Sequence, residues 1–150
     1  MASLTEKISA DTKEAMKARE RGRVNALRMV SSALSNEQIN LGHELSEDEE
    51  IAVLRRQLKQ REESAEAYRE AGRAEQADSE ATEAAVIRGY LPEPMSGEEL
   101  EQVAGRAIEE TGASGMKDMG NVMGRAKELA GNRADGKALS DAVRERLQGM

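Results

Sequence analysis

The stretch 90-YLPEPMSGEE-99 holds both prolines of the 150-residue chain. Each proline disfavours the α conformation in the residue before it, so a helix that arrives at Tyr90 has to end there. Ser96 and Glu99 have the spacing of a capping box, which predicts that a new helix begins at once. The stretch therefore predicts a boundary between two helical domains joined by a short linker. The first domain, the linker and the second domain cover residues 1–90, 91–95 and 96–150.

On both sides of this boundary, apolar residues recur at steps of three and four, which is the period of an amphipathic helix. Serine–glutamate pairs and terminating glycines supply the start and stop signals. The predicted helices cover about 4–18, 21–41, 46–71, 74–87, 96–112, 119–131 and 135–147. Met116, Met119 and Met123 are interpreted as core residues, the alternative being a peptide-binding groove. The pattern predicts an N-terminal domain of about four helices and a C-terminal three-helix bundle.

The composition agrees with an all-α fold. The chain has no Phe, no Trp, two Tyr and eight Met, so it has little of the aromatic material that strands prefer. A low content of large apolar residues with a net charge of −7 also resembles the composition of disordered chains. The agreement between the apolar period and the helix signals favours folding instead. Ala77, Ala81 and Ala84 share one helix face and predict the close approach of a neighbouring helix.

Residue types exclude several classes of catalytic site. The chain has no Cys and a single His, so disulfides, thiolate nucleophiles and His-rich metal sites are absent. Adjacent carboxylates such as Glu62 and Glu63 point about 100° apart on a helix and are interpreted as solvated surface. Residues 120–124 contain two glycines but lack the ending of a phosphate-binding loop. We assign no role to His43, and we predict no catalytic residue, no metal site and no cofactor.

The sequence shows no targeting or membrane-spanning segment. Nowhere do about 18 apolar residues follow one another, and charged residues interrupt the first helix. The expectation is a cytoplasmic protein that does not contact a membrane.

Basic residues are unevenly distributed along this acidic chain. Residues 13–28 contain six basic and two acidic side chains, and residues 117–146 contain seven and five. A smaller basic cluster lies at 55–61. Such clusters are where a phosphate backbone would bind. The alternative is that each cation pairs with a glutamate on its own helix, and the chain offers few aromatic side chains for base stacking.

Short segments distributed over nearly the whole chain carry a family resemblance. They are Met16-Lys17-Ala18, Leu27-Arg28-Met29, Glu37-Gln38-Ile39, Lys59-Gln60-Arg61-Glu62-Glu63-Ser64, Ala71-Gly72-Arg73, Tyr90-Leu91-Pro92-Glu93, Thr111-Gly112-Ala113-Ser114, Met116-Lys117-Asp118-Met119-Gly120, Val122-Met123 and Gly131 to Lys137. In this order and spacing the chain resembles the GatB/YqeY family, and specifically its small stand-alone YqeY-like members.

The resemblance implies a two-part helical protein similar to the helical and tail domains at the C-terminus of GatB. GatB is the tRNA-binding subunit of the glutamine-dependent amidotransferase, which amidates Glu or Asp mischarged on tRNA. Its ATP-using cradle domain has no counterpart in these 150 residues. The resemblance therefore implies a non-catalytic module that binds tRNA or associates with the amidotransferase, although the family carries the label of a carbon–nitrogen ligase with glutamine as amido-N-donor.

The expected partner is tRNA, or a complex of aminoacyl-tRNA with the amidotransferase, and not DNA. The residues expected to contact RNA are Lys117, Arg125, Lys127, Arg133 and Lys137. Arg133 and Lys137 flank Asp135 at the start of the last predicted helix, where backbone N–H groups attract phosphate. The alternative at this position is a plain helix cap made by the Asp135 carboxylate. The alternative function is a helical protein–protein adaptor with no RNA role.

Overall fold

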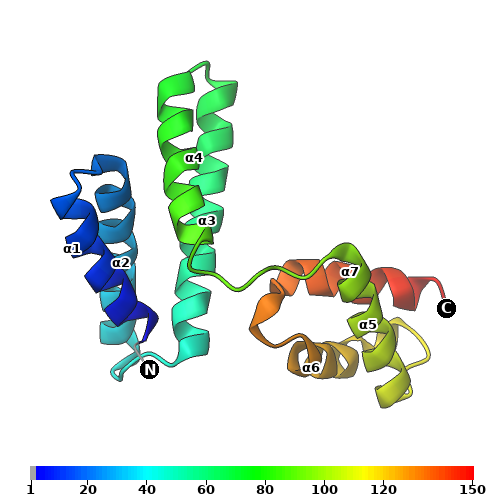
Figure 1. Ribbon diagram of the computed structural model, residues 1–150. Coiled ribbons are helices and arrows are strands. Elements are labelled where there is room, and N and C mark those ends of the chain that lie inside the picture. Colours follow the sequence, from blue (N-terminus) through cyan, green and yellow to red (C-terminus); the bar gives the residue numbers. More distant parts are fainter. Residues whose placement is uncertain (1–2) are drawn as a thin grey trace. The chain divides into compact units, whose positions relative to one another are not determined.

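The computed structural model describes residues 3–150, and every regular element in that range is helical (Figure 1). The elements are α1 (Leu4–Lys17), α2 (Arg21–Leu41), α3 (Glu47–Glu70), α4 (Ala74–Arg88), α5 (Gly97–Thr111), the short η1 (Met116–Asp118), α6 (Met119–Ala130), the short η2 (Gly131–Arg133) and α7 (Gly136–Gln148). The all-α class predicted from the sequence is confirmed. The chain forms two compact units, Met1–Leu91 and Pro92–Met150. Within residues 3–150 no helix is both long enough and apolar enough to cross a membrane.

Local capping signals set the helix limits. The Ser46 hydroxyl accepts the N–H of Glu49 at 3.2 Å, and the Glu49 carboxylate accepts the N–H of Ser46 at 2.9 Å. The bond from the Ser46 backbone lowers the pKa of the Glu49 carboxyl. Ser96 and Glu99 form the second capping box that the sequence predicts. Gly42 ends α2 with a φ of 74°, a left-handed conformation that glycine adopts without a steric penalty.

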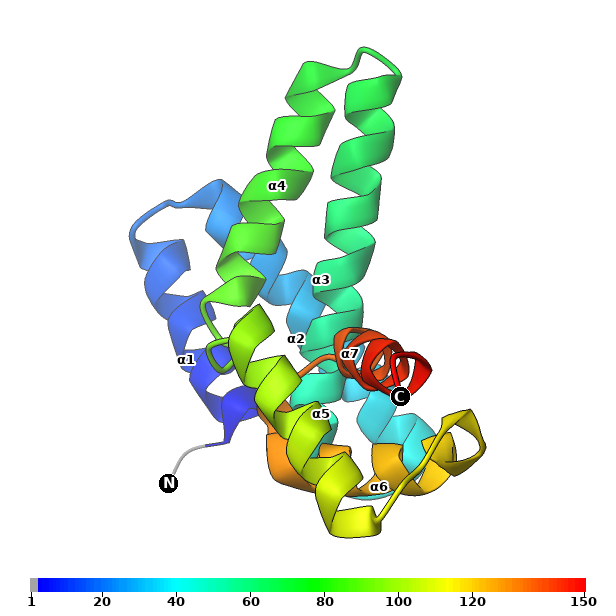
Figure 2. The ribbon, with the colours of Figure 1, turned by 90° about the vertical axis from the view of Figure 1, so that its right-hand side faces the viewer.

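The first unit packs α1 and α2 against a hairpin of α3 and α4. Figures 1 and 2 both show α3 and α4 side by side, and this pair makes the most extensive contact in the unit. The fully buried side chains include Ile8, Leu27, Leu34, Leu54 and Ile87. Ala77 and Ala84 on α4 are also buried, so this helix packs against its neighbours α3 and α2 partly through small side chains.

One carboxylate is buried in the first unit. Glu50, in the first turn of α3, is only 3% exposed. Its Oε2 accepts the backbone N–H of Thr5 at 2.8 Å and the Thr5 hydroxyl at 2.7 Å. Because Thr5 lies in the first turn of α1, the carboxylate also faces the positive end of that helix dipole. Glu50 therefore joins the starts of two helices that are far apart in the sequence.

Tyr90, in the segment after α4, forms hydrogen bonds with side chains of α1 and α2. Its hydroxyl donates to Asp11 on α1 at 2.5 Å and accepts from Arg23 on α2 at 3.4 Å. The Lys7 ammonium lies 5.7 Å from the ring centroid, within the range of a cation–π contact. Burial, and next the hydrogen bond to Asp11, raise the pKa of Tyr90 to about 12.

Stability is expected to fall in alkaline solution as Tyr90 ionises. A tyrosine in the unfolded chain has a pKa near 10, whereas that of Tyr90 in the folded chain is about 12. The stabilisation is therefore complete below about pH 10 and is lost as the pH rises to about 12. Because Tyr90 is partly exposed, we expect a loss of about 1 kcal/mol. Urea unfolding across this pH window should show a flatter dependence for Tyr90→Phe, and equal losses in both proteins would contradict this role.

The second unit is built from α5, α6 and α7 around its own core. Its buried residues are Ala104, Ala107, Ile108, Val122, Ala126, Ala130, Leu139, Val143 and Leu147. Met119 and Met123 pack against this core, as expected, but Met116 is 42% exposed. The core interpretation of Met116 is wrong because this residue lies in η1, outside the helix whose period placed it there.

We propose that the two units are domains that fold independently. Each has its own cluster of buried apolar side chains, and residues 91–95 contain no helix. Limited proteolysis of the native protein is expected to cut within about 90–97 and to leave two protected fragments. Cuts scattered evenly through both halves would contradict this division.

Candidate nucleic-acid interface

The five residues predicted to contact RNA all lie in the second unit, on four different elements. Lys117 is in η1, Arg125 and Lys127 are on α6, Arg133 is in η2, and Lys137 is in the first turn of α7. The structure divides them into two groups. Both arginines are bound to carboxylates, whereas the three lysines are exposed.

Arg125 belongs to an ion-pair network between α5 and α6. Its guanidinium binds Glu110, and its Nη1 also donates to Glu128 at 2.8 Å. Glu110 receives a second hydrogen bond from Arg106 at 3.0 Å. These bonds, first of all the one from Arg125, lower the pKa of the Glu110 carboxyl. The charge of Arg125 is thus compensated within the unit.

Arg133 holds the segment before α5 in place. Its Nη1 lies 2.9 Å from a carboxylate oxygen of Glu99, and its Nε donates to the Glu93 carbonyl at 3.2 Å. The Arg133 carbonyl in turn accepts the N–H of Met95 at 3.2 Å. The hydrogen bond from Arg133 is the main cause of the lowered pKa of Glu99. A phosphate would have to compete with this carboxylate, and charge reversal at Arg133 would disturb the fold as well as any RNA contact.

The three lysines differ from the arginines in having free ammonium groups. Lys117, Lys127 and Lys137 are exposed, and none forms an ion pair within residues 3–150. At the start of α7, the Asp135 carboxylate accepts the N–H of Lys137 at 2.9 Å. The helix cap, which the sequence left open as an alternative, is therefore present. Lys137 offers a phosphate its ammonium group, because its backbone N–H is already bound.

Two of these lysines flank a bare strip of α6. Gly120 and Gly124 lie one turn apart and are exposed, and apart from the adjacent backbone no atom lies within 4 Å of the position where a side chain would begin at either residue. Lys127 follows Gly124 by three residues and shares its face of α6, whereas Lys117 lies in η1, directly before α6. We call these four residues the lysine–glycine face. A ligand can approach the helix backbone there, because no Cβ is in the way.

A second group of free cations lies where α1 turns into α2. Its members are Lys13, Lys17, Arg19, Arg21 and Arg28, which we call the α1–α2 corner. None of them is ion-paired to a carboxylate of the described chain, whereas Arg23 in the same segment lies 3.9 Å from Glu20. The sequence identifies this segment as basic but leaves its residues unassigned, because counting charges does not distinguish paired cations from free ones.

The basic cluster at 55–61 is largely compensated by neighbouring helices. Arg56 binds Glu37 on α2. Arg61 lies 3.5 Å from Glu80 and 3.8 Å from Glu83, both on α4. Burial raises the pKa of the Glu83 carboxyl, with the charge of Glu80 as the next cause. These pairs hold helices together and leave little free charge for a phosphate.

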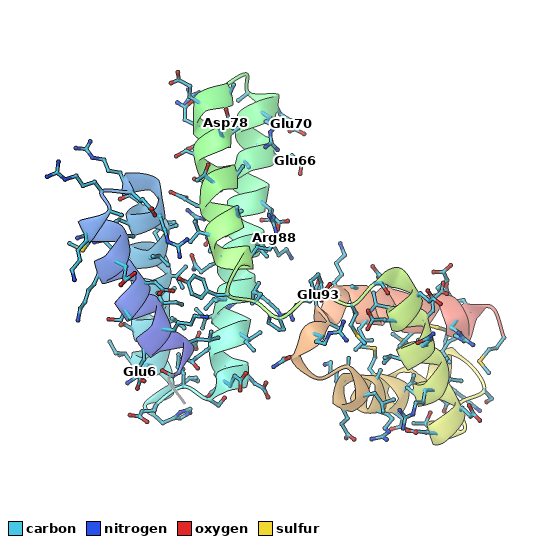
Figure 3. All side chains as sticks on the ribbon, in the orientation of Figure 1. Glu6, Glu66, Glu70, Asp78, Arg88 and Glu93 are labelled. Carbon is cyan, nitrogen blue, oxygen red and sulfur yellow. The ribbon has the colours of Figure 1, made fainter. Side chains whose placement is uncertain are left out.

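The acidic charge of the chain is concentrated on the α3–α4 hairpin. Residues 62–83 contain eight carboxylates and two arginines. Figure 3 shows Glu66, Glu70 and Asp78 toward the end of the hairpin where α3 turns into α4. The excess of carboxylates on this hairpin therefore accounts for most of the net charge of −7. It does not argue against an RNA surface on α6 or at the α1–α2 corner, since the local field decides where a polyanion binds.

The described residues offer no grouping that would hold a metal ion. Among residues 3–150 no group of three or more His, Asp or Glu side chains has an arrangement that could hold a metal ion. His43 makes a 2.7 Å contact between its Nδ1 and the Glu44 carbonyl, and its Nε2 lies 3.7 Å from Glu49. The ring is exposed on the loop between α2 and α3.

Comparison with known proteins places the chain in a family. The family model described as Yqey-like protein matches residues 5–147. The chain is also similar to altered inheritance of mitochondria protein 41, mitochondrial, of Pyrenophora tritici-repentis (strain Pt-1C-BFP). The two are 25% identical over 142 residues, which cover 93% of this chain and 78% of that protein. Because the family match runs through both units, from α1 to the last turn of α7, the chain belongs to the YqeY-like family, as its sequence segments indicate.

Proposed function

We propose that this YqeY-like protein is a non-catalytic helical module that binds tRNA and works beside an enzyme of glutamine-dependent tRNA amidation. The amidation chemistry then belongs to the partner, and the carbon–nitrogen ligase label describes the reaction of the whole assembly. The chain itself supplies surfaces that bind RNA. The proposal assigns no acid, base or nucleophile to any of its side chains.

The observation that carries the proposal is the lysine–glycine face. Lys117 in η1 precedes the two exposed glycines of α6, and Lys127 follows them on the same helix. The helical arms of tRNA are A-form, with a wide and shallow minor groove bordered by two phosphate strands. A smooth helix face fits such a groove, and each lysine would meet a phosphate at one border. Lys137 on α7 adds a third cation in the same unit.

Replacing Lys117, Lys127 and Lys137 together with glutamine is expected to weaken tRNA binding at least about tenfold at low salt. The slope of log K against log salt should become shallower by about two to three, because up to three phosphate contacts are lost. Filter binding or fluorescence anisotropy with the full-length protein measures both quantities. Unchanged affinity and slope in the triple variant would remove the lysine–glycine face from the proposal.

Two controls separate binding from folding. Gly124→Leu adds a side chain to the face at an exposed position and improves helix propensity, so it should weaken tRNA binding without lowering stability. Lys59, Arg69 and Arg73 are exposed basic residues of the first unit, and changing all three to glutamine removes the same charge elsewhere. With both variants measured at about 0.15 M salt, this control should bind tRNA within about twofold of the wild type, because charges outside the contact surface are largely screened there.

A second candidate function is a protein–protein adaptor, which one observation favours. Ile39 is 77% exposed and Leu41 is 43% exposed at the end of α2. The two side chains point to different sides of the helix because they are two residues apart, so Ile39, the more exposed of the two, is the candidate contact for a protein partner. In a pull-down from lysate, Ile39→Glu should then release a protein partner that RNase treatment leaves in place. Loss of every partner on RNase treatment would favour the RNA module.

A further inference from the structure

A shallow groove lies at the α1–α2 corner. It has a volume of about 570 Å³ and is lined by Met16, Arg19, Arg21, Val24, Asn25 and Arg28. All of the charged side chains that line it are arginines. The remaining lining combines apolar surface from Met16, which is 50% exposed, with one carboxamide.

The three arginines are held at the groove without carboxylate partners. Arg19, Arg21 and Arg28 are exposed, and none is ion-paired within residues 3–150. Within the described residues, Arg28 Nη2 lies 3.7 Å from the Met16 sulfur, and a thioether leaves the positive charge of the guanidinium uncompensated. Elsewhere in the chain, Arg56, Arg61, Arg125 and Arg133 all bind carboxylates. The groove is therefore a place where guanidinium groups stay available for a ligand.

Arg19 occupies a backbone position that normally favours glycine. Its φ of 59° is the one left-handed conformation of a non-glycine residue in the described chain, and arginine pays a steric cost there that glycine would not. The N–H of Arg19 donates to the Met16 carbonyl at 3.2 Å, and that of Glu20 donates to the Ala15 carbonyl at 3.0 Å, which closes the end of α1. The turn brings Arg19 beside Arg21 and Arg28 across the groove.

This lining matches the chemistry of an unpaired nucleotide. Guanidinium groups bind phosphate oxygens in a bidentate manner, and their planes stack on exposed bases. The Asn25 carboxamide can donate to and accept from the edge of a base. Met16 and Val24 offer apolar contact to a base face. Stacked bases inside a duplex do not expose these faces, so the groove suits a single strand.

We infer that the α1–α2 corner groove binds unpaired nucleotides of an RNA strand, with arginines in the stacking role that aromatic side chains have in other RNA-binding proteins. The inference takes RNA as the ligand from the proposed function, but it assigns a separate surface in the other unit. The lysine–glycine face meets the phosphates of a duplex, whereas this groove meets bases that a loop or a strand end leaves unpaired.

The test uses the full-length protein and two fluorescent RNA probes, a single strand of about twelve nucleotides and the blunt duplex of the same sequence. Changing Arg19, Arg21 and Arg28 together to glutamine should weaken single-strand binding at least about tenfold and leave duplex binding within about twofold. The control is the glutamine variant of Lys59, Arg69 and Arg73, which should bind both probes as the wild type does. Circular dichroism of each variant verifies the helical content.

A second variant separates stacking from charge. Changing the same three arginines to lysine keeps every positive charge but removes the planar groups, so single-strand binding should still fall about fivefold or more. If the lysine variant binds the single strand like the wild type, the groove is a general charge patch and the inference is overturned. Unchanged single-strand binding in the glutamine variant overturns it as well.

The two probes also distinguish this inference from the proposed function. In one outcome, duplex and tRNA binding depend on Lys117 and Lys127, but single-strand binding does not change when the three arginines are replaced. This outcome refutes only the corner groove. In the opposite outcome, the protein binds the single strand through the three arginines but binds neither tRNA nor the duplex. This outcome refutes only the tRNA proposal.

Discussion

Replacing Glu50 with alanine is expected to lower the free energy of unfolding of the first unit by about 3 kcal/mol. The substitution removes two hydrogen bonds to Thr5, both accepted by a buried carboxylate oxygen. It leaves the Thr5 N–H without a partner at the start of α1, and it removes a negative charge from the positive ends of two helices. No other side chain in the described residues is charged and buried to this degree.

Urea unfolding of the full-length protein, followed by circular dichroism, measures this effect. The midpoint for Glu50→Ala should fall by about 1–2 M, given the usual denaturant dependence of small domains. Glu47→Ala is the matched control, because Glu47 lies in the same helical turn but is exposed. It should cost less than about 0.5 kcal/mol. Equal midpoints for the two variants would show that Glu50 does not anchor α1.

The second large effect is expected from Ala84→Leu in α4. Ala84 is 2% exposed and lies where α4 packs against its neighbours. A leucine there has to displace a helix or adopt a strained rotamer, so the unit should lose about 2–3 kcal/mol. The same substitution at the adjacent Ala85, which is exposed, should be nearly neutral. The difference between the two variants isolates the close packing of the hairpin from helix propensity.

Thermal unfolding of both variants checks this prediction, with a midpoint for Ala84→Leu lower by about 10 °C or more. If Ala84→Leu were as stable as Ala85→Leu, the hairpin would have room for a large side chain at its centre. The alanine pattern of α4 would then reflect helix propensity alone and not a close approach of α3.

The helix limits could be predicted because their signals are local. The Ser46 and Ser96 capping boxes and the glycine at 42 act within one turn of the chain, so reading them requires no tertiary knowledge. The helical class follows from the same signals. The position of Met116 was predicted wrongly for a related reason, since a period of 3.6 residues places side chains only where the α-helix continues.

Contacts between distant segments could not be predicted from the sequence. Nothing in the sequence pairs Glu50 with Thr5, or Arg133 with Glu99, because such pairs depend on how the helices pack. The same limit applies to the predicted RNA contacts. Arg125 and Arg133 have the charge that phosphate binding needs, but the fold directs them to carboxylates. Lys117 and Lys127 are free, and their position beside the exposed glycines 120 and 124 depends on η1 preceding α6.

The most direct test of the proposed RNA function is the salt dependence of tRNA binding by the wild-type protein. The proposals assign six cations to RNA, namely Lys117, Lys127 and Lys137 in the second unit and Arg19, Arg21 and Arg28 at the groove. Each would release counterions from the phosphate that it contacts. The account predicts measurable binding at low salt and a slope of log K on log salt of up to about −5. No binding at low salt, or binding with a slope near zero, would contradict it.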